Sequence, residues 1–124
     1  MSERDDDVKI LRREVVLQRV SDERDRQEDL KANGKFKYTC ADAAMSNAER
    51  NLVLNEEVGE VARAILELNE LTKERETSDA GNQELQHILA LENQHGLKHL
   101  KEELQQVAAV CVAWLEALES ESDE

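Results

Sequence analysis

An apolar stripe runs unbroken through the last quarter of the chain. Its members recur at alternating spacings of three and four residues: Leu97, Leu100, Leu104, Val107, Cys111, Trp114 and Leu118. This alternation places all seven side chains on one face of an α-helix. A stripe of this length is typical of a helix that packs against other helices along its whole length. We therefore expect a fold built from packed helices.

The composition favours helices throughout the chain. There is no proline, there are four glycines, and Phe, Tyr and Trp occur once each. Leu, Ala, Glu, Gln, Arg and Lys dominate, and these residues favour helices over strands. A length of 124 residues suits one domain with a buried core. We predict an all-α fold with a single domain over residues 1–124.

The apolar periodicity and the helix-ending signals predict four helices. Their expected ranges are 8–31, 46–73, 83–94 and 97–119. Asn33-Gly34 should end the first helix, a capping box at Ser46 and Glu49 should begin the second, and His95-Gly96 should separate the last two. The acidic tail 119–124 is expected to fray. We predict a four-helix bundle-like fold whose thin core is completed by oligomerisation, as a homodimer or homotetramer.

The net charge and the lack of apolar runs limit the expected partners and location, and the two cysteines require no disulfide. The formal net charge is −13, so we expect neither nucleic acid nor an anionic membrane surface as a partner. There is no signal peptide and no apolar run that could cross a membrane, which makes the cytoplasm the expected location. Cys40 and Cys111 are the only cysteines, and nothing requires them to form a disulfide.

Two helical segments combine apolar residues with carboxylates three positions apart. The first is Glu56-Glu57-Val58-Gly59-Glu60 and the second is Glu103-Leu104-Gln105-Gln106. Residues three or four apart share a helix face, so Glu57 and Glu60 point the same way. Two carboxylates about 4 Å apart repel by roughly 4 kcal/mol at an effective dielectric near 20. A divalent cation relieves this repulsion, so facing helices would make these segments a metal site.

These segments resemble the MazG-like, all-α nucleoside triphosphate pyrophosphohydrolases. That family carries Glu-Glu-x-x-Glu on one helix and Glu-x-x-Asp on a later helix. The first motif is intact at residues 56–60, and the second retains Glu103 but has Gln106 where the family has aspartate. The likeness covers roughly the last two-thirds of the chain. It implies a MazG-type fold and an oligomer.

The resemblance also implies an activity, namely hydrolysis of a nucleoside triphosphate to the monophosphate and pyrophosphate in nucleotide-pool house-cleaning. Mg²⁺, with Mn²⁺ as an alternative, would be held by Glu57, Glu60, Glu103 and Gln106, and Glu56 would orient or deprotonate the attacking water. Candidate contacts to the triphosphate are Lys35, Lys37, Arg63, Lys98 and Lys101. Candidates for stacking on the base are Phe36, Tyr38 and Trp114.

Two other functions remain open at the level of sequence. Because Gln106 supplies a neutral oxygen in place of a carboxylate, the chain would instead be a weakly active or non-catalytic nucleotide-binding or regulatory module. A purely structural helical protein that assembles through its last helix is the third interpretation. His99 shares a helix face with Glu103, which makes it a candidate to support that ligand.

Overall fold

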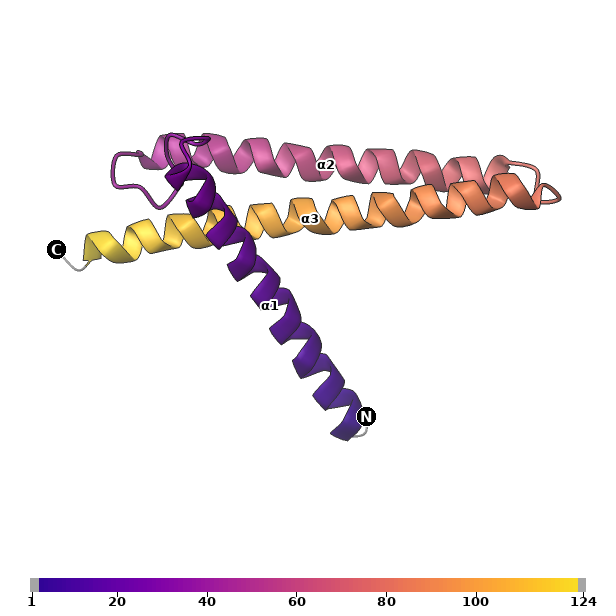
Figure 1. Cartoon of the computed structure of the whole chain (residues 1–124), viewed down its shortest axis with the longest axis horizontal. Coiled ribbons are helices and arrows are strands. Elements are labelled where there is room, and N and C mark those ends of the chain that lie inside the picture. The colour runs from indigo at the N-terminus through magenta and orange to yellow at the C-terminus, as the bar shows by residue number, and fades with distance from the viewer. Residues whose placement is uncertain (1–2, 123–124) are drawn as a thin grey trace. The chain divides into compact units, whose positions relative to one another are not determined.

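The computed structural model describes residues 3–122, which form three helices and no strand (Figure 1). They are α1 (Glu3–Ala32), α2 (Asn47–Thr77) and α3 (Gln83–Ser122). The all-α prediction is confirmed. The helices contribute to two compact units, which are described separately: Met1–Leu54 with Gln105–Glu124, and Asn55–Leu104.

The prediction of four helices is wrong, because the two expected over 83–94 and 97–119 are one continuous helix, α3. His95-Gly96 does not end a helix. A glycine inside a helix costs only about 1 kcal/mol, which packing readily outweighs. At Gly96 a Cβ atom would lie 3.1 Å from Leu68 Cδ1 and 3.5 Å from Leu71 Cδ1. The glycine therefore marks a close approach of α2 rather than a helix end.

The other helix ends follow local chemistry. Asn33-Gly34 ends α1 as predicted, with Gly34 at a φ of 78°, in the left-handed region that glycine favours. The predicted capping box is also confirmed: the Glu49 amide donates to Ser46 Oγ, and the Ser46 amide donates to Glu49 Oε1.

Each helix is longer than predicted. Helix α1 begins at Glu3, because three acidic residues in its first turn complement the helix dipole. Helix α2 continues to Thr77. Helix α3 continues to Ser122, through residues 119–122 of the acidic tail that we expect to fray. Residues 123–124 of that tail lie outside the described range.

The first unit has a small core around the loop that joins α1 to α2. Cys40, Val110 and Ala113 are buried there. The partly buried residues packed against them are Ala41, Met45, Val53 and Leu54. Trp114 is half-buried, and its indole N–H donates to Asn47 Oδ1 at 2.9 Å. Cys40 and Cys111 do not form a disulfide with each other. The loop thus packs against the ends of two helices through small side chains.

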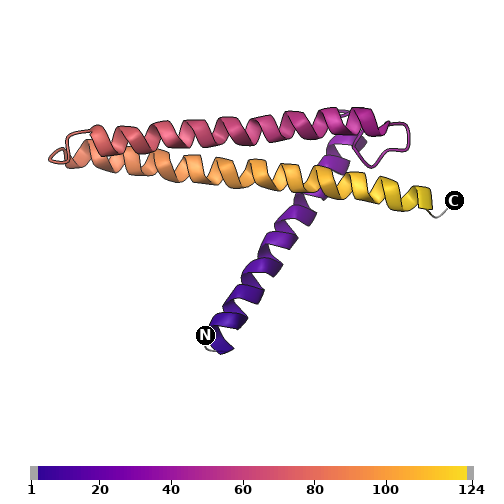
Figure 2. The same cartoon turned by 180° about the vertical axis from the view of Figure 1, so that it is seen from behind.

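The second unit is an antiparallel helix pair, made by residues 55–77 of α2 and 83–104 of α3 (Figure 2). Ala64 and Leu89 are buried between them. Gly96 lies against Leu68, and Thr72 Oγ1 lies 3.5 Å from Asn93 Oδ1. These contacts fix the antiparallel register. Glu60 lies two turns before Leu68 on α2, and Leu104 lies two turns after Gly96 on α3. Because the two helices run antiparallel, Glu60 and Leu104 lie level with each other.

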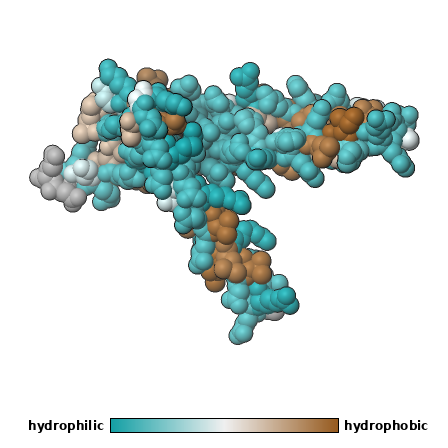
Figure 3. Space-filling model, viewed as in Figure 1, coloured by the Kyte–Doolittle hydropathy of each residue, from teal (hydrophilic) through white to brown (hydrophobic). Residues whose placement is uncertain are grey.

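Much apolar surface is exposed. The stripe of α3 is not covered along its whole length as predicted, since Leu97, Leu104 and Leu118 are exposed. Figure 3 shows apolar patches over the N-terminal half of α1 and over the helix pair near the 78–82 connector. None of the helices within residues 3–122 has a stretch that is both long and apolar enough to cross a membrane.

Candidate functional site

Glu103 is the most deeply buried acidic residue of the predicted metal site. Its side chain lies on the face of α3 that packs toward α2, and the residue is 5% exposed. Its Oε1 atom lies 3.7 Å from His99 Nε2, one helical turn away. Its Oε2 atom is buried and has no hydrogen-bond partner within residues 3–122. A buried carboxylate oxygen without a donor is costly, so this atom is suited to accept a cation or an incoming donor.

The acidic motif of α2 lies in the same helix pair. Glu57 is half-buried and its Oε2 atom is shielded from solvent, while Glu60 and Glu56 are exposed. The register places Glu60 level with the turn that holds Glu103. The unit therefore carries Glu60 and Glu103 at one height, with Glu57 about one helical turn nearer the start of α2.

The carboxylates are not already gathered as a metal centre. Within residues 3–122, no three His, Cys, Asp or Glu side chains converge closely enough to hold a metal ion. The donor chemistry nevertheless suits Mg²⁺ or Mn²⁺, which bind carboxylate oxygens. The buried Oε2 of Glu103 gives such an ion one oxygen that no other group in the described part of the chain binds. By this test the types of donor suit a divalent cation, and its binding here stays a prediction.

Gln106 lies one turn beyond Glu103 on α3 and is half-buried. Its amide oxygen is neutral and attracts a cation less strongly than the aspartate of the resembled family would. Glu102 does not replace it, because it is exposed and its Oε1 lies 4.0 Å from Lys98 Nζ. The prediction that Gln106 is a ligand stays untested.

The predicted substrate contacts fall into two places. Lys35, Phe36, Lys37 and Tyr38 belong to the first unit, where all four are exposed on the loop after α1. Lys37 Nζ lies 5.4 Å from the centre of the Tyr38 ring, a cation–π contact. Lys101 is exposed on α3 in the second unit. Their assignment to the substrate stays a prediction.

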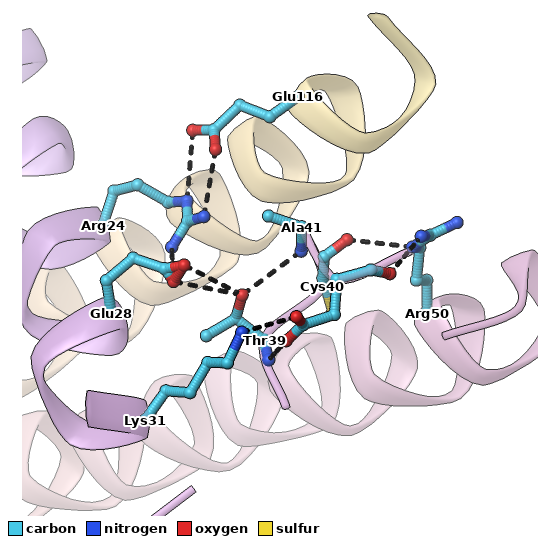
Figure 4. A network of polar contacts seen from close by, with 9 residues as sticks. Arg24, Glu28, Lys31, Thr39, Cys40, Ala41, Arg50 and Glu116 are labelled. Carbon is cyan, nitrogen blue, oxygen red and sulfur yellow. Dashed lines mark hydrogen bonds and ion pairs between the residues drawn. The ribbon is translucent and has the colours of Figure 1, made fainter. Parts of the chain in front are cut away.

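The second half of the loop is anchored by polar contacts (Figure 4). Lys31 donates to Asp42 Oδ1, and the Thr39 amide donates to Asp42 Oδ2 at 2.7 Å. The Lys31 hydrogen bond lowers the pKa of Asp42 and raises that of Lys31. The Thr39 hydroxyl also lies 3.3 Å from a carboxylate oxygen of Glu28. These contacts leave residues 35–38 as the exposed half of the loop.

Two buried arginines complete this anchor, and neither is among the residues predicted from the sequence. Arg50 is fully buried and donates to the carbonyl oxygens of Cys40, at 2.9 Å, and Asp42, at 2.7 Å. Arg24 is buried on α1 and makes two parallel hydrogen bonds, of 3.1 and 3.0 Å, to Glu116. Burial lowers the pKa of Arg24, but the bonds to Glu116 and Glu28 outweigh it and the pKa is raised. The sequence gives no signal for either, because arginines on charged helices normally face solvent.

No family model, curated protein or solved structure matches this chain.

Proposed function

We propose that the chain is a metal-dependent nucleoside triphosphate pyrophosphohydrolase. The observation that carries the proposal is Glu103 Oε2, a buried oxygen without a hydrogen-bond donor, in the helix pair that also carries the acidic motif of α2. A carboxylate left in this state is costly to the folded chain. A bound cation is one partner that would satisfy such an oxygen.

The acidic residues have two roles in the proposed reaction. Glu57, Glu60 and Glu103 would hold the divalent cation, which neutralises phosphate charge when it is bound. Water attacks a phosphorus atom at the α–β bridge, the bond from that phosphorus to the bridging oxygen breaks, and pyrophosphate and the monophosphate separate. Glu56, which is exposed at the start of the motif, would orient this water and accept its proton.

Neighbouring glutamates of α3 supply a matched pair of variants for the test. Pyrophosphate release is measured from canonical and modified nucleoside triphosphates with Mg²⁺ or Mn²⁺. Glu103→Gln should lower kcat at least a hundredfold, whereas Glu102→Gln, an equal change of charge at an exposed position, should stay within about twofold. Absence of pyrophosphate release from the unmodified protein with every substrate, or equal effects of the two variants, would refute the proposal.

A second candidate is nucleotide binding without hydrolysis, and Gln106 is the residue that favours it. A neutral oxygen at this position weakens the attraction for a cation and for the charge that develops during phosphoryl transfer. Gln106→Asp separates the two functions. If the unmodified protein binds nucleotide but hydrolyses it only after this change, the binding module is the better description.

A further inference from the structure

The first half of α1 is a helix that no other described part of the chain covers. Every residue from 3 to 19 is exposed, and the first partly buried residue is Val20. Isolated helices of this length are marginal in water, and packing normally stabilises them. The large apolar side chains of this stretch are between 46% and 60% exposed: Val8, Ile10, Leu11, Val15, Val16 and Leu17. Residues 3–19 therefore form a helical arm that a partner would stabilise.

This arm is basic, although the protein is acidic. Residues 8–20 contain four basic residues and one acidic residue, whereas the whole chain has a formal net charge of −13. At about 100° per residue, the four cations fall within about 120° of the helix surface, and Glu14 lies almost opposite them. One valine lies among the cations. We call this surface the basic face: Lys9, Arg12, Arg13, Val16 and Arg19.

The basic face combines unpaired arginines with a shallow apolar hollow. Within residues 3–122, Arg12, Arg13 and Arg19 form no ion pair. The hollow is lined by Lys9, Arg12, Arg13, Val16 and Leu17, mostly through their aliphatic parts. An apolar side chain with carboxylates on either side of it would fill the hollow and pair with the guanidinium groups around it.

The charges at the two ends of the basic face limit the kind of anion that fits it. Residues 8–20 span about 18 Å along the helix. The three aspartates 5–7 precede this stretch, and Asp22 and Glu23 follow it. A nucleic-acid duplex or an anionic bilayer presents negative charge continuously over a longer distance, so it would also meet these carboxylates. The pattern fits a partner whose negative charge is confined to a similar length.

Two other occupants fit the arm poorly. A helix that lies in a bilayer surface buries an apolar face opposite its cations. Glu14 and Gln18 lie on that side of the arm, and the Gln18 amide donates to Asp22 Oδ1 at 2.9 Å. Two copies that meet through their basic faces would bring arginine against arginine, and like charges repel.

We propose that the basic face of α1 binds an acidic helical segment of another protein. Side chains of a partner helix recur at the same spacing as those of α1, so carboxylates can follow the cations over about three turns. Arg12, Arg13 and Arg19 donate to these carboxylates, and the forked geometry of arginine fixes the register of the segment. The arm belongs to the first unit, so its binding does not depend on the proposed hydrolase activity.

Two synthetic helical peptides of identical composition test the charge pattern. One carries glutamates and a leucine in its centre and lysines at both ends, and the other has the glutamates at the ends and the lysines in the centre. Fluorescence anisotropy of each labelled peptide with the full chain measures Kd. The peptide with the acidic centre should bind about tenfold more tightly or better, because only this peptide matches both the basic face and its acidic ends. Its Kd should rise with NaCl.

Charge reversals on the chain test the position of the interface. Arg12→Glu should raise the Kd of the acidic-centre peptide by about tenfold, because it replaces an attraction with a repulsion. Arg75→Glu is an equal change of charge at an exposed position of α2, and it should stay within about twofold. Both positions are exposed, so circular dichroism of the free chain should not change.

The same measurements can overturn the proposal. Equal affinity for the two peptides, or equal effects of Arg12→Glu and Arg75→Glu, would show that the pattern of the basic face is not recognised. Tighter binding of phosphatidylserine vesicles or of duplex DNA than of the acidic-centre peptide would assign the arm to a membrane or to nucleic acid. A dimer of the free chain that Arg12→Glu dissociates would show that a second copy covers the face instead.

Discussion

Glu103 gives the sharpest prediction because it links stability to the proposed chemistry. Its Oε2 atom is buried without a donor, and its other oxygen lies 3.7 Å from His99. Glu103→Gln keeps the shape of the side chain and removes the charge. We expect the variant to be more stable than the unmodified protein when no divalent metal is present, and less stable when metal is abundant.

The magnitude follows from the cost of an unsatisfied buried group. A buried acceptor without a partner costs about 1–3 kcal/mol, and the glutamine amide recovers only part of this because it also needs a partner. A gain of about 1–2 kcal/mol is therefore expected without metal. For a domain of this length that corresponds to a rise in Tm of roughly 3–10 °C. Metal at a hundred times its Kd should add about 2.7 kcal/mol to the unmodified protein alone.

Thermal unfolding at one protein concentration, with EDTA or with Mg²⁺, measures both effects. Glu102→Gln serves as the control, since its exposed position should hold the change within about 0.5 kcal/mol. A lower Tm for Glu103→Gln in EDTA would show that the carboxylate is already well stabilised. An equal response of both variants to Mg²⁺ would remove Glu103 from the metal site.

Three further predictions concern stability and pH. Gly59 has no heavy atom within 4 Å of an added Cβ, so Gly59→Ala should raise the free energy of unfolding by about 0.8–1 kcal/mol in urea titrations. Gly96→Leu should lower it by about 1–3 kcal/mol, because Leu68 already occupies that space; an increase would contradict the close packing. Because the pKa of Asp42 is lowered in the folded protein, its contribution to the free energy of unfolding is complete above about pH 4 and is lost as the pH falls through the folded-state pKa. Because the pKa of Lys31 is raised, its contribution to the free energy of unfolding is lost at high pH. The difference in urea midpoint between the unmodified protein and Asp42→Asn should therefore be constant from about pH 5 to 9 and shrink on either side; a difference that grows on acidification would reverse this assignment.

Local signals in the sequence were sufficient for most of the helix ends. Ser46 and Glu49 form the capping box because the contact depends on residues three positions apart. Gly34 ends α1 because the left-handed backbone conformation needed there requires only a glycine at that position. Gly96 is also a glycine that suggests a helix end, but the prediction that a helix ends there is wrong. Its role depends on Leu68, which is distant in sequence.

The candidate site was predictable only as a set of residue types. The spacing of Glu57, Glu60 and Glu103 identified carboxylates on helix faces, and all three fall in the same compact unit. Their different degrees of burial were not predictable, because the spacing of residues along one helix does not determine how deeply a neighbouring helix covers each of them. Arg24 and Arg50 were missed for the same reason, since their partners come from other segments.

The sequence by itself determined an all-α chain, its loop between α1 and α2, and the acidic motifs, because helix propensity, capping and periodicity act over a few residues. Tertiary structure decided that α3 is one helix through Gly96, that Glu103 is buried with an oxygen lacking a hydrogen-bond donor, and that the stripe of α3 is left partly exposed. These features arise where two helices meet. Which side chains a neighbouring helix covers, and which it leaves to solvent, depends on register and packing that no single segment encodes.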